Sequence, residues 1–171
     1  MILDTAKCVA CSACVVGCKM ENRVPDGYFR DWVVNETRGT YPNLTAENRS
    51  ERCNHCEKAP CVDNCPTGAS YHAEDGTVQI ARDKCSGCKN CIVACPYGAR
   101  YVHPEGFIDK CTFCPHIEGS TSCTMICPTE CITFGDANDP ESDVSRLLRE
   151  RQLKTVHPEA GTWPQVYYIT G

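Results

Sequence analysis

The stretch Cys85-Ser-Gly-Cys88-Lys-Asn-Cys91-Ile-Val-Ala-Cys95-Pro96 decides the fold, because its four cysteines follow the spacing C-x2-C-x2-C-x3-C and a proline follows the fourth. Three further copies of this pattern occur along the chain, two of them with a longer gap before the third cysteine. They comprise Cys8, Cys11, Cys14 and Cys18; Cys53, Cys56, Cys61 and Cys65; and Cys111, Cys114, Cys123 and Cys127. Sixteen of the seventeen cysteines therefore belong to one repeated motif.

This spacing is the ligand run of bacterial proteins that bind [4Fe–4S] clusters. The first three cysteines wrap one cubane, and the fourth reaches the cluster of a partner motif. Sixteen thiolates, four to each cluster, predict four [4Fe–4S] clusters, and a chain of 171 residues with four redox centres is most simply an electron carrier. C-x2-C pairs also bind zinc. Zinc sites, however, use two separated pairs and do not need a fourth cysteine before proline.

Composition argues against a disulfide scaffold, because the cysteine count is odd and the C-x2-C spacing repeats. No secretory signal and no apolar run of about 20 residues is present, so we expect a cytoplasmic chain without membrane spans. The formal net charge is −5. Each oxidised cubane with four thiolates carries about −2, which brings the loaded protein to about −13 and makes nucleic acid an improbable partner.

The motifs share more than cysteine. Three of them continue with proline after the fourth cysteine, and the repetition predicts an α+β, duplicated bacterial-ferredoxin-like fold. Two lobes would each hold two clusters, accompanied by long loops and a C-terminal tail. A basic residue precedes every motif, either as a solvated charge or as a cation that raises the potential of a cluster. These residues are Lys7, Arg52, Lys84 and Lys110.

Motifs must pair, because each fourth cysteine serves another motif's cluster. Only nineteen residues separate the second motif from the third, so these two should form an inserted lobe over residues 51–103. The first and fourth motifs then form the other lobe, from residues 1–50 plus 104–171. The predicted ligand sets are Cys8, Cys11, Cys14 with Cys127; Cys111, Cys114, Cys123 with Cys18; Cys53, Cys56, Cys61 with Cys95; and Cys85, Cys88, Cys91 with Cys65.

Short helical turns are expected between the third and fourth cysteines, followed by short strands. Strands at 70–72 and 77–80 flank Asp75-Gly76, a strong hairpin signal. A looser hairpin is expected at 100–108. Residues 19–51 contain no recognised element and are expected to form a long loop, whose aromatic residues pack over the clusters or dock a partner. In the tail, Asp139 should cap a helix with Pro140 at its first position. An extended segment over 159–168 could clamp a lobe or an interface.

Cys131 occupies the position that alanine takes in two other copies, which indicates a small buried residue with an inert thiol; a spare ligand is the alternative. His55 and His116 lie inside ligand loops, where packing or hydrogen bonding is expected. No dinucleotide fingerprint, Walker loop or nucleophile elbow is present, so no catalytic residue is assigned. An electron-transfer subunit of an oxidoreductase complex and a free polyferredoxin both fit these features. The long loop and the tail favour the subunit, and four clusters exceed what an iron–sulfur sensor needs.

The arrangement resembles the four-cluster iron–sulfur (beta) subunits of molybdopterin oxidoreductases, which serve dimethyl-sulfoxide, polysulfide, thiosulfate and arsenate reductases. The resemblance covers nearly the whole chain, including the residues after Cys18, the Gly87-to-Cys91 loop and the tail from Gly161 to Tyr168. It implies a large molybdopterin- or tungstopterin-containing catalytic subunit as partner. It also implies that the cluster of Cys8, Cys11, Cys14 and Cys127 lies nearest the catalytic site, with a membrane quinol subunit or soluble carrier at the far end.

Some relatives replace a cysteine of the third motif and hold a [3Fe–4S] cluster, whereas all four are present here. The chain is short for the resembled family, which would suit the soluble complex of a tungsten aldehyde oxidoreductase as an alternative partner. Family members without a signal of their own can be exported while bound to a partner. The resemblance therefore leaves room for a periplasmic location and for membrane association through that partner.

Overall fold

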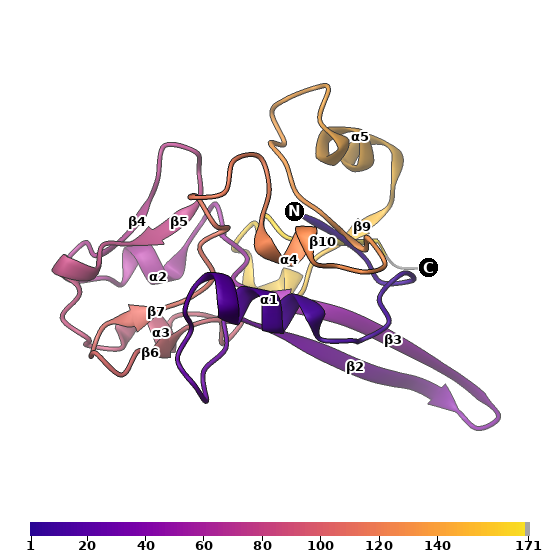
Figure 1. Ribbon diagram of the computed structural model, residues 1–171, viewed down its shortest axis with the longest axis horizontal. Coiled ribbons are helices and arrows are strands. Elements are labelled where there is room, and N and C mark those ends of the chain that lie inside the picture. Colours follow the sequence, from indigo (N-terminus) through magenta and orange to yellow (C-terminus); the bar gives the residue numbers. More distant parts are fainter. Residues whose placement is uncertain (170–171) are drawn as a thin grey trace.

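The computed structural model describes residues 1–169 (Figure 1). A four-stranded sheet in the order β8-β1-β10-β9 ties the two ends of the chain together. Its strands are β1 (Ile2–Asp4), β8 (Ile132–Thr133), β9 (Leu153–Lys154) and β10 (Tyr167–Ile169). β1 runs parallel to β10 and antiparallel to β8. The sheet contributes three buried side chains to one apolar core: Leu3, Ile132 and Tyr168. The first residues of the chain and its tail therefore stabilise each other.

Four short helices pack in two pairs. α1 (Ala13–Glu21) lies against α4 (Ser122–Met125), and α2 (Pro60–Asp63) lies against α3 (Asn90–Val93). Each helix contains the third cysteine of its motif, so the helical turns expected between the third and fourth cysteines are confirmed. Figure 1 shows the α2 and α3 pair on one side of the molecule and the α1 and α4 pair toward the other. Within residues 1–169 no helix is both long and apolar enough to cross a bilayer.

Two small hairpins follow the second and third motifs. β4 (Ser70–His72) pairs antiparallel with β5 (Val78–Ile80) around the predicted Asp-Gly turn. A one-turn 3-10 helix, η1 (Arg82–Lys84), then leads into the third motif. β6 (Tyr101–Val102) pairs with β7 (Ile108–Asp109). Both hairpins expected from the sequence are therefore confirmed.

The prediction that residues 19–51 form a long loop is wrong. Beyond α1, most of this segment forms a long antiparallel hairpin of β2 (Asp31–Thr40) and β3 (Asn43–Arg52), which projects from the body of the molecule (Figure 1). Its strands carry polar residues on both faces toward the tip, so no apolar alternation marked them as strands. Ion pairs stabilise it instead, including Arg49 to Glu36 at 2.6 Å. Tyr41, at the tip, is 85% exposed, so it does not pack over a cluster.

The tail helix α5 (Asp143–Glu150) begins later than expected. Ser142 is its N-cap, because the Ser142 Oγ accepts a hydrogen bond from the Ser145 amide at 3.1 Å. Asp139, the predicted cap, accepts from the Glu141 amide at 3.0 Å and so forms the turn before the helix. Serine and aspartate are both good N-caps, so composition alone did not separate them. Val144 packs the helix onto the body, where it is fully buried.

After the 3-10 turn η2 (Pro158–Ala160), the tail crosses the ligand loop of the second motif. The amides of Glu57 and Lys58 donate to the carbonyls of Trp163 and Thr162 at 2.9 and 3.0 Å. The ammonium of Lys58 also lies 3.9 Å from the centroid of the Trp163 ring. The segment over 159–168 is not extended throughout, because the 3-10 turn reaches Ala160 and Gly161 and Trp163 are left-handed. Its contacts connect the second motif to the sheet that contains β1.

Candidate iron–sulfur centres

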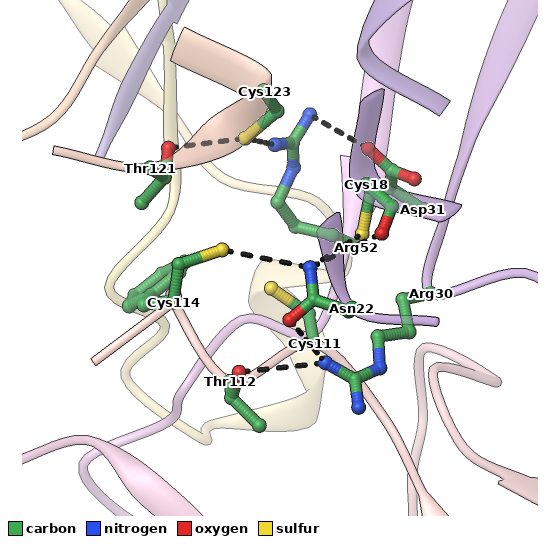
Figure 2. A pocket seen from close by; sticks show the side chains of 11 residues that line it. Cys18, Asn22, Arg30, Asp31, Arg52, Cys111, Thr112, Cys114, Thr121 and Cys123 are labelled. Atoms are coloured by element: carbon green, nitrogen blue, oxygen red, sulfur yellow. Dashed lines mark hydrogen bonds and ion pairs between the residues drawn. The ribbon is translucent and has the colours of Figure 1, made fainter. Parts of the chain in front are cut away.

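Figure 2 shows a cavity between α1, α4 and the fourth ligand loop, with an empty volume of about 290 Å3 that includes space open to solvent. Four cysteines line it: Cys18, Cys111, Cys114 and Cys123. Cys18 comes from the first motif and the other three from the fourth, which is the composition of one predicted ligand set. All four side chains are buried.

A second cavity of nearly equal size, about 310 Å3, lies at the other end of α1. Cys8, Cys11 and Cys14 of the first motif line it together with Cys127 of the fourth. Cys131 lines the same cavity. Its Sγ lies 3.4 Å from the Sγ of Cys127, and its side chain is buried as the sequence predicted.

The second motif meets the fourth cysteine of the third. Burial raises the pKa of Cys61 to about 11; Arg100 opposes that rise, and the neighbouring Cys53 and Cys95 add to it. Burial raises the pKa of Cys56 as well, again with contributions from Cys53 and Cys95. These mutual effects require the thiols to lie close together, although they come from two motifs.

The remaining cysteines approach one another in the same way. Burial raises the pKa of Cys91; Arg100 opposes this rise, and Cys65 and Cys85 contribute to it. Cys88 is exposed at the surface of the loop. The fourth cysteine of the second motif is therefore brought to the first and third cysteines of the third motif.

One backbone feature recurs in all four ligand loops. The residue just before the second cysteine has a left-handed conformation, with φ between 43° and 67°. These residues are Ala10, His55, Gly87 and Phe113. Only one is glycine, and a left-handed conformation costs other residues about 1–2 kcal/mol. Such backbone turns aim successive amides into a concavity that binds anions, including iron–sulfur clusters. The strain is therefore what an anionic cluster site requires.

Backbone amides donate hydrogen bonds to two of the fourth cysteines, Cys65 and Cys127. The Ser70 amide donates to the Sγ of Cys65 at 3.3 Å, and the Cys131 amide donates to the Sγ of Cys127 at 3.4 Å. Burial alone would raise the pKa of Cys65, but these hydrogen bonds and the Thr67 hydroxyl lower it below its usual value. The pKa of Cys127 is lowered in the same way. Because iron binds the thiolate form of cysteine, these donors favour ligation.

Two buried guanidinium groups touch cysteine sulfurs. Arg52 Nη1 donates to the Sγ of Cys123 at 2.7 Å, and Arg100 Nη2 donates to the Sγ of Cys61 at 2.8 Å. Burial raises the pKa of Cys111 to about 12, whereas the charge of Arg52 opposes that rise. The cations therefore favour the thiolate form inside an apolar interior that disfavours it.

The donor set fits clusters better than single ions. Among residues 1–169, no three histidine, cysteine or acidic side chains converge closely enough to hold one metal ion. Eight of the motif cysteines instead line two cavities, four to each, as the ligands of a larger group would. Buried arginines beside the sulfurs fit a group whose net charge is negative.

His55 and His116 make the packing and hydrogen-bond contacts that the sequence predicted. His55 is buried, accepts a hydrogen bond from the Val78 amide at 3.1 Å and stacks on Phe113. His116 is half exposed and lies 2.9 Å from Glu21. Of the four basic residues before the motifs, Arg52 and Lys110 are buried, while Lys7 and Lys84 are exposed.

Sequence analysis missed Arg100 and Asn22 as residues that contact the sulfurs. The Nδ2 of Asn22 lies 3.7 Å from the Sγ of Cys18 and 3.6 Å from that of Cys114, as Figure 2 shows. Arg30 holds Asn22 in place through a 2.8 Å hydrogen bond to its side-chain oxygen. The only signal was position: Asn22 follows Cys18 by one helical turn, and Arg100 follows Cys95 by five residues.

Comparison with known proteins agrees with this geometry. Two family models, each described as a 4Fe-4S dicluster domain, match overlapping parts of the chain, residues 44–137 and residues 7–69. The chain is 42% identical to the protein NrfC homolog of Haemophilus influenzae, over 99% of this chain and 78% of that protein.

Two further relatives have names that state a role. The B subunit of polysulfide reductase from Wolinella succinogenes is 38% identical, over 99% of this chain and 92% of the relative. The thiosulfate reductase electron transfer subunit PhsB of Salmonella typhi is 39% identical, over 90% of this chain and 82% of that protein. With the repeated cysteine motif and the two dicluster domains, the chain belongs to the family of iron–sulfur electron-transfer (beta) subunits of molybdopterin oxidoreductases.

Proposed function

We propose that the chain holds four [4Fe–4S] clusters in two ferredoxin-like lobes and carries electrons between a molybdopterin (Mo or W) catalytic subunit and a quinol-linked membrane subunit or soluble carrier. One lobe comprises residues 1–50 and 104–171, and the other is the inserted segment 51–103. The packing of α1 on α4 and of α2 on α3 supports this division. When bound, the clusters supply one-electron redox chemistry at potentials set by their surroundings.

The observation that carries the proposal is that three cysteines of one motif and the fourth of another face the same cavity. This occurs in both cavities of the lobe that contains the first and fourth motifs. In the inserted lobe, the electrostatic effects of the thiols on one another support the same exchange of fourth cysteines between motifs. The proposed ligand sets are Cys8, Cys11, Cys14 and Cys127; Cys111, Cys114, Cys123 and Cys18; Cys53, Cys56, Cys61 and Cys95; and Cys85, Cys88, Cys91 and Cys65.

Two of these sets are inner, those that begin with Cys111 and Cys53. The two that begin with Cys8 and Cys85 are outer. Cys53 contributes to the raised pKa of Cys111, where burial is the largest cause, so the second and fourth motifs meet across the lobe boundary. Every cysteine of the inner sets is buried except Cys95, which is partly buried, whereas each outer set has one exposed cysteine. Those exposed cysteines are Cys11 and Cys88. The outer sets are thus suited to exchange electrons with partners, and the inner sets to relay them between lobes.

The protein supplies no group for substrate chemistry in this proposal, since every cluster has four sulfur ligands. Its residues hold the thiolates, donate hydrogen bonds to sulfur and keep water from the inner sites. Relatives named as polysulfide and thiosulfate reductase subunits support a catalytic partner that selects the substrate. The partner also determines whether the complex lies at a membrane.

The exchange of fourth cysteines gives a direct test. Cys18→Ala and Cys114→Ala should abolish the same cluster signal in the electron paramagnetic resonance spectrum of the reduced complex, because both residues belong to one set. Cys11→Ala, which lies in the same motif as Cys18, should abolish a different signal. If Cys18→Ala removes the signal that Cys11→Ala removes, the proposed ligand sets are wrong.

The partner is tested by purification from the native cells. We expect the chain to co-purify with a large subunit that contains molybdenum or tungsten bound to a pterin. A chain that elutes alone, fully loaded with iron, would instead be a free polyferredoxin.

A further inference from the structure

Two arginines occupy equivalent places in the two lobes. Arg52 is 1% exposed; its guanidinium donates to the Sγ of Cys123 at 2.7 Å and to the hydroxyl of Ser50. Arg100 is 5% exposed and donates to the Sγ of Cys61 and to the hydroxyl of Ser70, both at 2.8 Å. The arginines come from different sides of their motifs, one before and one after. The same arrangement of guanidinium, serine and third cysteine is therefore built twice.

Lys110 is a third buried cation, and it lies at the boundary between the lobes. Its side chain is fully buried, and its Nζ donates to the carbonyls of Val78 at 2.5 Å and Cys111 at 2.7 Å. Val78 belongs to β5 in the inserted segment, whereas Cys111 begins the fourth motif. The Lys110 ammonium therefore lies beside the backbone of an inner-set cysteine.

Two of these three cations have no carboxylate partner among the described residues, and the third has only one at the edge of ion-pair distance. The Nη2 of Arg52 lies 4.0 Å from the Oδ2 of Asp31. Among residues 1–169, no carboxylate lies within 4.0 Å of a side-chain nitrogen of Arg100 or Lys110. An unpaired buried cation is strongly unfavourable, so a compensating anion must be present in the loaded protein. A cluster with four thiolates is such an anion, and both arginines already touch sulfurs of the inner sets.

We propose that Arg52, Arg100 and Lys110 are the residues that make the two buried inner clusters reducible, by raising their reduction potentials into the range of the exposed outer clusters. The inference rests on the proposed ligand sets. Reduction adds a negative charge to each cluster, and burial in a low dielectric opposes that addition. Without a compensating charge, the inner sites would therefore be barriers to electron transfer between the lobes. A cation in contact with the cluster ligands stabilises the added charge and offsets the effect of burial.

The positions of the cations explain why the effect falls on the inner sites. The short arginine–sulfur hydrogen bonds, at 2.7 and 2.8 Å, go to the inner-set cysteines Cys123 and Cys61. The charge of Arg100 also acts on Cys91, and that of Arg52 on Cys14, so we expect a smaller effect at the outer sets as well. Lys110 adds a charge between those two sets. At the outer sets, the basic residues that precede the motifs are Lys7 and Lys84, and both are exposed to solvent. Water screens such charges, so they change a cluster potential much less.

The test is a potentiometric titration of the intact complex, monitored by electron paramagnetic resonance. Arg52→Gln should shift the signal that Cys114→Ala abolishes to lower potential by at least tenfold in its reduction equilibrium, about 59 mV for one electron. Arg100→Gln should shift the other inner signal by a similar amount. Arg52→Lys, which keeps the charge but loses the planar fork, should shift less than Arg52→Gln.

Lys84→Gln is the matched control, because this cation also precedes a motif but is exposed; it should leave every potential close to that of the unmodified complex. Inner-cluster potentials in both glutamine variants that shift no more than in Lys84→Gln would overturn the inference. If Arg52→Gln fails to assemble, Arg100→Gln and Arg52→Lys decide the question alone. An unmodified complex with clearly fewer than about sixteen irons per chain would instead contradict the proposed function.

Discussion

The imidazole of His55 stacks on the phenyl ring of Phe113, with ring centroids 3.8 Å apart and planes 13° from parallel. His55 lies in the ligand loop of the second motif and Phe113 in that of the fourth, and each is the left-handed residue before the second cysteine of its loop. Phe134 also packs edge-on against Phe113 at 5.3 Å. One aromatic contact therefore joins the ligand loops of the two inner sites across the boundary between the proposed lobes.

Removing this contact should destabilise the loaded protein. We expect Phe113→Ala to lower the free energy of unfolding by about 3–5 kcal/mol, because it leaves a cavity beside two ligand loops. The denaturant midpoint of the iron-loaded protein measures this loss. Phe29→Ala is the control, since Phe29 is 51% exposed and should cost much less. Equal losses in the two variants would show that the stack does not hold the loops together.

Gly87 has a role that depends on close approach of two backbones. Its φ is +67°, and an added Cβ would lie 2.4 Å from the carbonyl oxygen of Gly106. Gly98, which has a φ of +62°, would place its Cβ in open space. Gly98→Ala should therefore cost about 1–2 kcal/mol for its left-handed conformation alone. We expect Gly87→Ala to cost clearly more and to weaken iron retention in the third motif, as measured by iron content after gel filtration.

A result in which both alanine variants lose equal stability would contradict this account. It would mean that the loop of the third motif can move away from Gly106 without cost, so that the close approach does not fix the loop.

Arg30 and Asp109 form a buried bidentate ion pair, with both N–O distances at 2.9 Å. Asp109→Asn leaves the Arg30 charge uncompensated, and we expect a loss of about 3–5 kcal/mol in the free energy of unfolding. Glu150→Gln breaks a surface pair with Arg146 at 3.6 Å and should change stability by at most about 0.5 kcal/mol. Thermal unfolding of both variants with intact clusters makes the comparison. Similar midpoints would show that Asp109 is not needed to balance Arg30.

Cys131 should be dispensable as a ligand. Alanine occupies the matching positions 69 and 99, where it is buried, so Cys131→Ala should keep the full iron content of the protein. Burial raises the pKa of the Cys131 thiol to about 12, and Cys127 adds to this rise, which favours a neutral, inert thiol. Iron and sulfide analysis of the variant is the measurement. Loss of one cluster in Cys131→Ala would make this thiol a ligand after all.

Much of the site could be predicted because ligand spacing is a local property. Four helices at the third cysteines and two hairpins follow directly from the motifs and from turn signals such as Asp75-Gly76. The long hairpin from Asp31 to Arg52 could not be predicted in this way. Its distal part is stabilised by cross-strand ion pairs rather than by a buried face, so it shows no apolar alternation.

The contacts between arginines and cysteine sulfurs also could not be predicted from the sequence. Arg52 precedes the second motif but contacts the fourth, and Arg100 follows the third motif but contacts the second. Only the tertiary packing of the helix pairs sets these partners. The sequence marked four basic residues as equivalent, whereas the fold buries Arg52 and Lys110 and exposes the other two.

The central claim is that the sixteen motif cysteines bind four iron–sulfur cubanes, and metal analysis tests it most directly. Iron and acid-labile sulfide should be measured on the protein purified without exposure to oxygen. The account predicts about sixteen irons and about sixteen sulfides per chain. Stoichiometric zinc without labile sulfide, or disulfides in place of metal, would contradict it.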